Sequence, residues 1–287
     1  MFVKSAEAGS DFSMDYLGDC YYYGRGVEKN YSTAITWYTK ASEKGNKYAK
    51  YMLGWCYEKG EGVTADIETA KKYYTEASEL GHNSSKERLE NIIKTEENEK
   101  KRNELYSEAL NYRNSKYYYA AFPKMLEAAE LGHVDAMNWV GVFYQNGQGT
   151  ETNLVEAEKW YKKGVNKGDI YYAGTNLGIL YYNQQKYSEA LEWYNKGAAE
   201  GNHYAFTGLG DCYYYGCGVE KDYSKAMVYY LAASGGNHSG ANYMVGWCYE
   251  HGQGTDKDME NAKYYYGIAA KLGHSGAQQR LDELGWS

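Results

Sequence analysis

Apolar side chains recur along this chain at a spacing that places them on one face of a helix. From Ala49 to Tyr57 the apolar positions follow i, i+3, i+4, i+7 and i+8, which predicts an amphipathic helix with one buried face. A second apolar segment follows a glycine-containing stretch, and there Ala70 stands three residues before the aromatic pair Tyr73-Tyr74. The pattern therefore predicts two helices joined by a turn.

This hairpin pattern occurs six times. Each predicted first helix carries a Leu-Gly or Val-Gly pair, and successive glycines lie 32 to 37 residues apart except across the gap from Gly54 to Gly141. The pairs are Leu17-Gly18, Leu53-Gly54, Val140-Gly141, Leu177-Gly178, Leu209-Gly210 and Val245-Gly246. One hairpin cannot bury its own apolar face, so we expect the copies to stack around a continuous core.

Glycines occur at the predicted turns and helix contacts of the hairpins. A G-x-G motif follows the first helix in five of the six copies, and such glycines supply the positive φ angles that end a helix. The glycine of each Leu-Gly or Val-Gly pair is expected to let the second helix approach closely. Polar residues are expected to cap the second helices: Asn30, Asp66, Asn153 and Asp222.

The pattern A-x-x-x-L-G-x-x-Y-x-x-G-x-G-V, present from Ala49 to Val63, resembles the Sel-one-like repeat family, a relative of the tetratricopeptide repeats. The resemblance covers most of residues 1–83 and 134–287. It implies an all-α fold, a right-handed superhelical α-α solenoid of helix-hairpin repeats. It also implies an adaptor that holds protein partners, without implying any particular partner.

The repeats and their departures predict a domain organisation with a break between two stacked arrays near residues 95–104. Residues 86–104 are rich in charges of both signs and have few apolar positions, which is typical of a solvated helix. The expected segments are 1–10, the second half of a repeat, either a cap or the remnant of upstream repeats; 11–83, two repeats; 84–104, a charged capping or linker helix; 105–133, a divergent tetratricopeptide-like repeat; 134–273, four repeats, of which 169–202 has a short turn; and 274–287, a C-terminal cap helix.

Two repeats have been copied together within the chain. Leu17–Ser32 matches Leu209–Ser224 at 14 of 16 positions, and Tyr51–Gly62 matches Tyr243–Gly254 at 9 of 12, both at an offset of 192. We call the segments that contain these matches the first cassette and the second cassette.

Charge and composition exclude several classes of function. The net charge is −7 with no Lys/Arg-rich block, so nucleic-acid binding is not expected. No apolar run reaches the ~18–20 residues that a membrane span requires. Motifs for a catalytic nucleophile, a zinc site or a phosphate loop are missing from the sequence, and five of the six histidines fall in equivalent turns. We therefore expect no enzyme activity, no metal and no cofactor.

The cysteines point to a reducing compartment. Four of them lie on the predicted buried face and are expected to be buried and reduced: Cys20, Cys56, Cys212 and Cys248. Cys217, between two glycines, is expected to be exposed. By resemblance, some secreted family members join each hairpin with a disulfide, and this chain has no second-helix cysteine for one. A cytoplasmic location is favoured, with secretion as the alternative if the N-terminus is truncated.

A second stripe runs along the first helices beside the core face, at i, i+3, i+7 and i+10. By resemblance to tetratricopeptide solenoids it lines the concave groove, and it supplies the candidate partner-binding residues. These are Asp15, Asp19, Tyr22, Tyr48, Tyr51, Trp55, Glu58, Tyr172, Tyr182, Tyr204, Asp211, Tyr214, Tyr243, Trp247 and Glu250. Rigid aromatic rings beside carboxylates suit an extended basic or aromatic peptide. The alternative is that Tyr51 and Trp55 simply pack against the next repeat.

These observations predict a non-enzymatic scaffold that binds a protein or peptide. Because the two cassettes share stripe residues, a repetitive or dimeric partner is favoured. One alternative is a cell-envelope or secreted protein that binds a small molecule or glycan, with or without hydrolysis. Another is a pathogen effector that binds a host factor.

Overall fold

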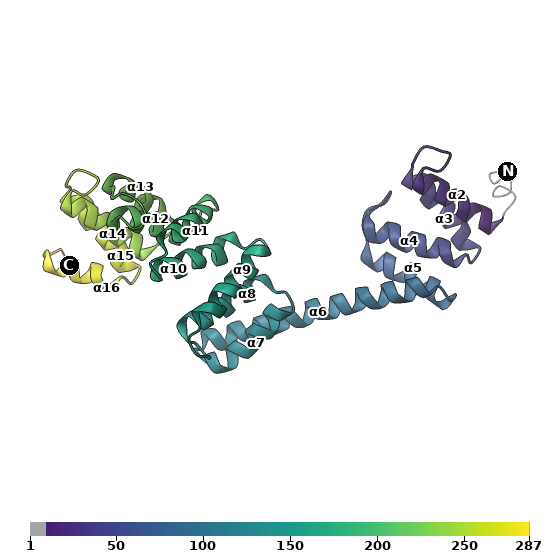
Figure 1. Ribbon diagram of the computed structural model, residues 1–287, viewed down its shortest axis with the longest axis horizontal. Helices are drawn as coiled ribbons and strands as arrows, with labels where there is room; N and C mark the ends of the chain where they lie inside the picture. Colours follow the sequence, from purple (N-terminus) through teal and green to yellow (C-terminus); the bar gives the residue numbers. More distant parts are fainter. Residues whose placement is uncertain (1–9, 287) are drawn as a thin grey trace. The chain divides into compact units, whose positions relative to one another are not determined.

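The computed structural model describes residues 10–286, and every regular element within that range is a helix (Figure 1). In chain order these are α2 (Asp11–Tyr23), α3 (Tyr31–Glu43), α4 (Lys47–Lys59), α5 (Ile67–Glu79), α6 (Asn83–Asn114), α7 (Tyr118–Glu130), α8 (Val134–Asn146), α9 (Leu154–Asn166), the π-helix η1 (Ile170–Gly174), α10 (Thr175–Asn183), α11 (Tyr187–Ala199), α12 (His203–Tyr215), α13 (Tyr223–Ser234), α14 (Ser239–His251), α15 (Met259–Lys271) and α16 (Ser275–Glu283). The predicted all-α fold is confirmed. The half repeat predicted for residues 1–10 lies almost wholly outside the described residues.

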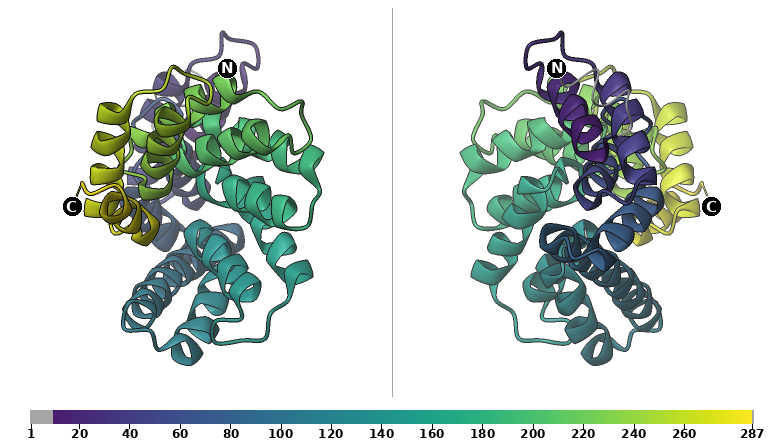
Figure 2. Two further views of the ribbon diagram at one scale, coloured as in Figure 1. Left: turned by 90° about the vertical axis from the view of Figure 1, so that its left-hand side faces the viewer. Right: turned by 90° about the vertical axis from the view of Figure 1, so that its right-hand side faces the viewer.

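The helices form hairpins that stack in chain order. Six pairs of helices pack as hairpins: α2–α3, α4–α5, α8–α9, α10–α11, α12–α13 and α14–α15. Each second helix also packs on the first helix of the next hairpin, except that α9 packs on η1 and that α5 is followed by α6. The chain forms two compact units, residues 1–100 and 101–287. Figure 2 shows the hairpins of the second unit, coloured teal to yellow, following one another around an arc. This is the predicted solenoid of hairpins.

The turn chemistry follows the sequence closely. α4 ends at Gly60, whose φ of 70° is left-handed, and Gly62 is also left-handed with φ 78°. Asp66 then caps α5 by accepting hydrogen bonds from the Glu68 and Thr69 amides. Asn30, Asn153 and Asp222 cap their helices in the same way. The predicted caps and glycine turns are therefore confirmed.

Close approach of the two helices of a hairpin depends on the repeat glycine. A Cβ atom added to Gly54 would lie 2.8 Å from the ring of Tyr74, and Tyr74 is fully buried. The same glycine-on-tyrosine contact recurs at Gly18 against Tyr38, where the distance would be 2.6 Å. In the six repeats, the second helix thus places a tyrosine ring directly against the repeat glycine of the first helix.

The tyrosines that recur at fixed positions of the repeat differ in burial between the first and second helices. Those on second helices are buried: Tyr74, Tyr161, Tyr194, Tyr230 and Tyr266. Those on first helices are only half-buried: Tyr21, Tyr57, Tyr213 and Tyr249. Tyr57 therefore lies less deeply than the predicted buried face of its helix implied. Tyr57 shows the reason, because its ring stacks at 5.8 Å on Tyr73 at the edge of the hairpin.

The segment between the cassettes is organised by one long helix. α6 does not end near residue 104 but continues to Asn114, and Ala109 in its last part is buried with Ala121 and Met125 of α7. The C-terminal part of α6 therefore serves as the first helix of the divergent hairpin. The next departure is the repeat at 169–202, which begins with a π-helix and turns at Gln185, whose φ is 61°.

The cysteine predictions need two corrections. Three cysteines are buried: Cys56, Cys212 and Cys248. Burial raises the pKa of these three thiols to about 12. Cys20 is only half-buried, because among the described residues α2 has a hairpin partner on one side alone. Cys217 is half-buried rather than exposed, since its sulfur packs 3.8 Å from the Tyr182 hydroxyl.

Candidate partner-binding surface

The predicted stripe lies over a hollow in the first unit. A cavity of about 310 Å³ between α2 and α4 is lined by Tyr22, Tyr23, Tyr48, Tyr51, Met52 and Trp55. Four of these six residues belong to the predicted stripe. We call this cavity the aromatic pocket, and we call the face of the first helices that carries the stripe the groove face.

Carboxylates stand beside the aromatic pocket. The pKa of Tyr48 is raised, first by burial and then by the neighbouring Asp19, Tyr23 and Asp15, so these groups lie close to the Tyr48 hydroxyl. Asp19 accepts a hydrogen bond of 2.7 Å from the Tyr38 hydroxyl. Asp15 differs, because its Oδ1 is buried and no group in the described part of the chain donates to it. Burial, and then the charges of Asp19 and Asp11, raise the pKa of Asp15 to about 7.

The glutamates at the ends of α4 and α14 are tied into the fold. Glu58 accepts hydrogen bonds of 2.9 Å from the Tyr74 hydroxyl and 2.8 Å from Arg88 Nε. The Arg88 bonds are the main reason why the pKa of Glu58 is lowered to about 2. In the second cassette Glu250 is buried and accepts from the Tyr266 hydroxyl at 2.8 Å and from Arg280 Nε at 3.0 Å. These two stripe residues join the last hairpin of each cassette to the helix that follows it.

Tyrosine and tryptophan side chains of the stripe also connect neighbouring repeats. Tyr22 is buried, and its hydroxyl donates to Glu61 Oε2 at 2.5 Å and is hydrogen-bonded to Trp55. The second cassette repeats the arrangement: Tyr214 donates to Gln253 Oε1 at 2.5 Å and accepts from Trp247 Nε1 at 2.9 Å. The contact between Trp55 and Tyr22 therefore supports the alternative in which Trp55 packs against a neighbouring repeat. Tyr22 and Glu250, being buried, offer little surface to a partner.

The two cassettes differ at the aromatic pocket. Five lining residues are retained at the offset of 192: Tyr214, Tyr215, Tyr243, Met244 and Trp247. The position of Tyr48 is Gly240, and the position of Asp15 is Thr207, whose hydroxyl donates to the His203 carbonyl at 2.9 Å. The copies therefore present different surfaces.

The remaining stripe residues lie on the groove face of the second unit. Tyr172 and Tyr204 are exposed by 58% and 61%, whereas Tyr182 and Tyr243 are half-buried. Asp211 accepts from the Tyr230 hydroxyl at 2.8 Å, as Asp19 does from Tyr38. Tyr172 also lines a hollow of about 320 Å³, together with Tyr106, Leu110, Asp135, Asn138 and Trp139. These residues belong to the second unit, whereas the aromatic pocket belongs to the first.

Histidines perform a role that sequence reasoning missed. The Nδ1 atoms of four of the turn histidines, His82, His133, His238 and His274, accept the backbone N–H three residues on. His133, His238 and His274 thereby cap α8, α14 and α16, the helices that begin directly after them. Asn46 and Asn202 cap α4 and α12 at the equivalent position. Because asparagine is a strong capping residue, its presence at the same repeat position could have indicated that these histidines cap helices.

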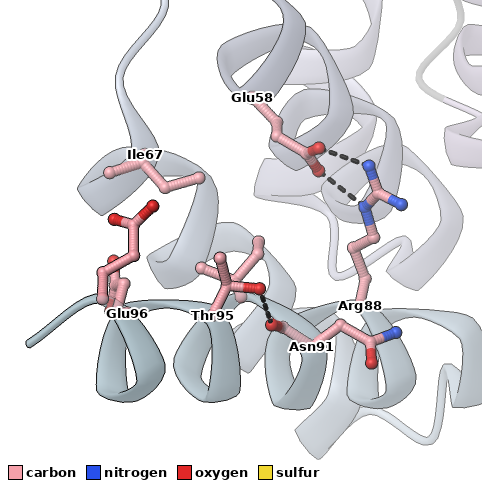
Figure 3. A pocket seen from close by; sticks show the side chains of 8 residues that line it. Glu58, Ile67, Arg88, Asn91, Thr95 and Glu96 are labelled. Carbon is pink, nitrogen blue, oxygen red and sulfur yellow. Dashed lines mark hydrogen bonds and ion pairs between the residues drawn. The ribbon is translucent and has the colours of Figure 1, made fainter. Parts of the chain in front are cut away.

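A larger hollow lies on another side of the first unit. Its volume is about 440 Å³, and it is lined by Glu58, Ile67, Arg88, Asn91, Ile92, Thr95, Glu96 and Glu99. Figure 3 shows Arg88 directed at Glu58 and the Thr95 hydroxyl at the Asn91 carbonyl, a bond of 2.8 Å. Glu96 is paired with Lys71 at 3.0 Å. Only Glu58 was predicted here, and the polar groups just described satisfy one another.

Neither a metal centre nor a membrane span is found within residues 10–286. No three His, Cys, Asp or Glu side chains of this range are grouped so that they could hold a metal ion. None of the helices in the same range combines the length and the apolar character needed to cross a bilayer.

Comparison of the sequence with known families gives a match along most of the chain. The Sel1 repeat family matches six segments: residues 12–46, 47–82, 134–169, 171–202, 205–238 and 239–274. A Sel1-like repeat-containing protein of Acanthamoeba polyphaga mimivirus is 31% identical over 91 residues, which is 32% of this chain and 17% of that protein. The match therefore spans a small part of that relative's length.

A solved structure shares the fold, and a second gives a lower TM-score. The crystal structure of a Sel1 repeat protein from Oxalobacter formigenes is similar, with a TM-score of 0.52 and 22% identity over 99% of this chain and 78% of that one. A protective antigen of uropathogenic Escherichia coli strains, which displays an SLR fold, gives a TM-score of 0.49 and 26% identity over 99% of this chain and 58% of that one.

Proposed function

The chain belongs to the Sel1 repeat family, and from this premise we propose that it holds a basic protein or peptide on the groove face of its first unit. Sel1 repeat proteins are generally protein-interaction scaffolds, and their solenoid is typically non-catalytic. The finer assignment, to one face and one chemistry of partner, is our own proposal.

The aromatic pocket carries the proposal. Its tyrosine and tryptophan rings offer a large contact area at a low cost in conformational entropy. The carboxylate of Asp15 stands beside them without a hydrogen-bond donor among the described residues, and the chain as a whole has a net charge of −7. An apolar surface next to a carboxyl group without a paired cation is complementary to a basic partner, because a nearby positive charge favours the ionised form of Asp15.

The first cassette is the better of the two candidate sites. Asp15 and Tyr48 occur only there, because Thr207 and Gly240 occupy the equivalent positions of the second cassette. Glu58 and Glu250, which the two cassettes share, are occupied by Arg88 and Arg280 in each copy. We therefore propose one main contact site in unit 1.

Quantitative affinity capture tests this proposal. The full chain and the variant Y48A are immobilised, and proteins retained from the lysate of the source organism are compared by mass spectrometry. The matched control is Y264A, which removes a tyrosine that is 62% exposed on the second helix α15. We expect at least one basic protein to be lost by about tenfold with Y48A, the size of effect typical of a contact residue, and to be retained with Y264A.

Equal capture by the wild type and Y48A would contradict the placement on the aromatic pocket. Equal loss with Y264A would show that binding does not depend on the groove face. Melting curves of both variants establish that the compared proteins are folded.

A further inference from the structure

The duplicated cassettes provide an internal comparison for the aromatic pocket. At the offset of 192 they retain five pocket residues and the Tyr-Trp hydrogen-bond arrangement. They differ at two positions, Asp15 and Tyr48, and in the first cassette the charge of Asp15 is among the causes that raise the pKa of Tyr48. Since the fold of the second cassette forms without these two groups, folding of the hairpins does not require them.

The Asp15 carboxylate is costly to the fold as it stands. A buried carboxylate oxygen without a hydrogen-bond donor is unfavourable, and no described residue donates to Asp15 Oδ1. Asp19 beside it adds a second negative charge. The charged groups that act on the pKa of Asp15 are the acids Asp19 and Asp11, and both raise it.

We infer that Asp15 and Tyr48, together with the aromatic pocket, form a receptor for a primary ammonium group carried by the bound peptide. The group is either a lysine side chain or the free amino terminus of the peptide. This inference rests on the proposed function, since it names the chemistry that the groove face recognises.

The site favours an ammonium over a guanidinium. Arginine binds carboxylates best through two parallel hydrogen bonds to both oxygens, and one oxygen of Asp15 is buried. An ammonium is a compact charge with three donors, and the Tyr48 hydroxyl is a neighbouring acceptor. The rings of Tyr48 and Tyr51 lie 6.3 Å apart and can contact the apolar stem of a lysine.

Selected peptides provide the test. Random dodecapeptides displayed on phage are selected on the immobilised full chain, and the enriched sequences are synthesised for fluorescence titration. Each is made with a free and with an acetylated amino terminus, and with each lysine replaced by norleucine or by arginine. The acetylated and norleucine forms distinguish the two sources of the ammonium group.

The protein variants take their residues from the second cassette. D15T and Y48G introduce the residues found at Thr207 and Gly240, so both are expected to fold, and melting curves check this. Y264A again serves as the control outside the groove face. We expect one ammonium, from a lysine or the terminus, to account for a tenfold or greater loss of affinity when it is removed.

The expected signature is non-additivity. Removing the ammonium should weaken binding to the wild type and to Y264A by tenfold or more, but to D15T by less than twofold, because the partner charge is already missing. Equal losses on the wild type and on D15T would overturn the inference while leaving the proposed function standing. Failure of any peptide to be enriched, together with equal capture from lysate by the wild type and Y48A, would overturn both.

Discussion

At the scale of single residues, the carboxylates of the stripe differ in whether the fold gives them a hydrogen-bond donor. Most of them accept a hydrogen bond from the buried tyrosine of the second helix: Asp19 from Tyr38, Glu58 from Tyr74, Asp211 from Tyr230 and Glu250 from Tyr266. These bonds satisfy the hydroxyl of a buried ring. Asp15 has no such donor, and this distinguishes it from the acids that hold the fold together.

The pH dependence of stability tests the state of Asp15. Its pKa is raised from 3.8 to about 7, so the folded protein keeps a proton that the unfolded chain has already lost. The contribution of Asp15 to the free energy of unfolding is therefore fully present below pH 3.8 and is lost as the pH rises through about 7. D15N, which is neutral throughout, should therefore raise the free energy of unfolding at pH 8 by on the order of 1–2 kcal/mol, allowing for solvent screening.

Thermal melts of D15N and the wild type at pH 4 and pH 8 check this expectation. D256N, which removes an exposed carboxylate, controls for the change in net charge. A gain of the same size at both pH values, or a loss at pH 8, would show that Asp15 is not held in an unfavourable environment.

At the scale of the helices, glycine has opposite effects at two kinds of position. In α4 a Cβ on Gly54 would lie 2.8 Å from the Tyr74 ring and 3.2 Å from the Ala70 carbonyl oxygen. In α15 a Cβ on Gly267 would meet nothing within 4 Å. G54A should therefore destabilise the protein by about 1–3 kcal/mol through overpacking. G267A should stabilise it by about 0.5–1 kcal/mol through helix propensity.

Urea unfolding followed by circular dichroism measures both changes in the same background. Gains of stability in both variants would mean that the glycine-on-tyrosine contact is loose enough to admit a methyl group. Losses in both would mean that Gly267 is needed for a reason other than close packing.

Much of the element level could be predicted from the sequence. Periodicity, G-x-G turns and capping residues act locally, so hairpins such as α4–α5 were predictable. The full extent of α6 was not, because its charge-rich middle carries little apolar periodicity and its last part is defined by Ala109 packing on α7. The π-helix η1 was not predicted either; its Ala173 packs closely on Gly164, where an added Cβ would lie 3.0 Å from the Ala173 Cβ.

The candidate site was predictable as a face but not as individual contacts. The stripe pattern predicted four of the six residues that line the aromatic pocket. It could not show which acids are already bonded, because the acceptor for the second-helix tyrosine changes position between repeats. In the first repeat it is Asp19, next to Gly18, and in the second it is Glu58, one turn beyond Gly54. Only side-chain packing distinguishes Asp15 from them.

At the scale of the whole molecule, the chain divides into two compact units with the boundary between Lys100 and Lys101. Most residues of α6 from Lys94 to Glu104 are exposed, and few of them pack in a core. Limited trypsin digestion should therefore cut first within 94–104, because segments with little buried apolar contact open most readily. Mass spectrometry of the early fragments identifies the site, and first cuts within 134–200 would place the weak point elsewhere.

The central claim, that a basic partner is held at the aromatic pocket, is tested most directly by photo-cross-linking. A photoreactive phenylalanine derivative replaces Tyr51 in the pocket or, as control, Tyr264 on α15, and the irradiated lysate is analysed by mass spectrometry. The account predicts that position 51 labels a defined partner at a segment close to a lysine or to its amino terminus, and that position 264 does not label that partner. Adducts of equal yield from both positions, or a pocket adduct on an acidic segment without a nearby amine, would contradict it.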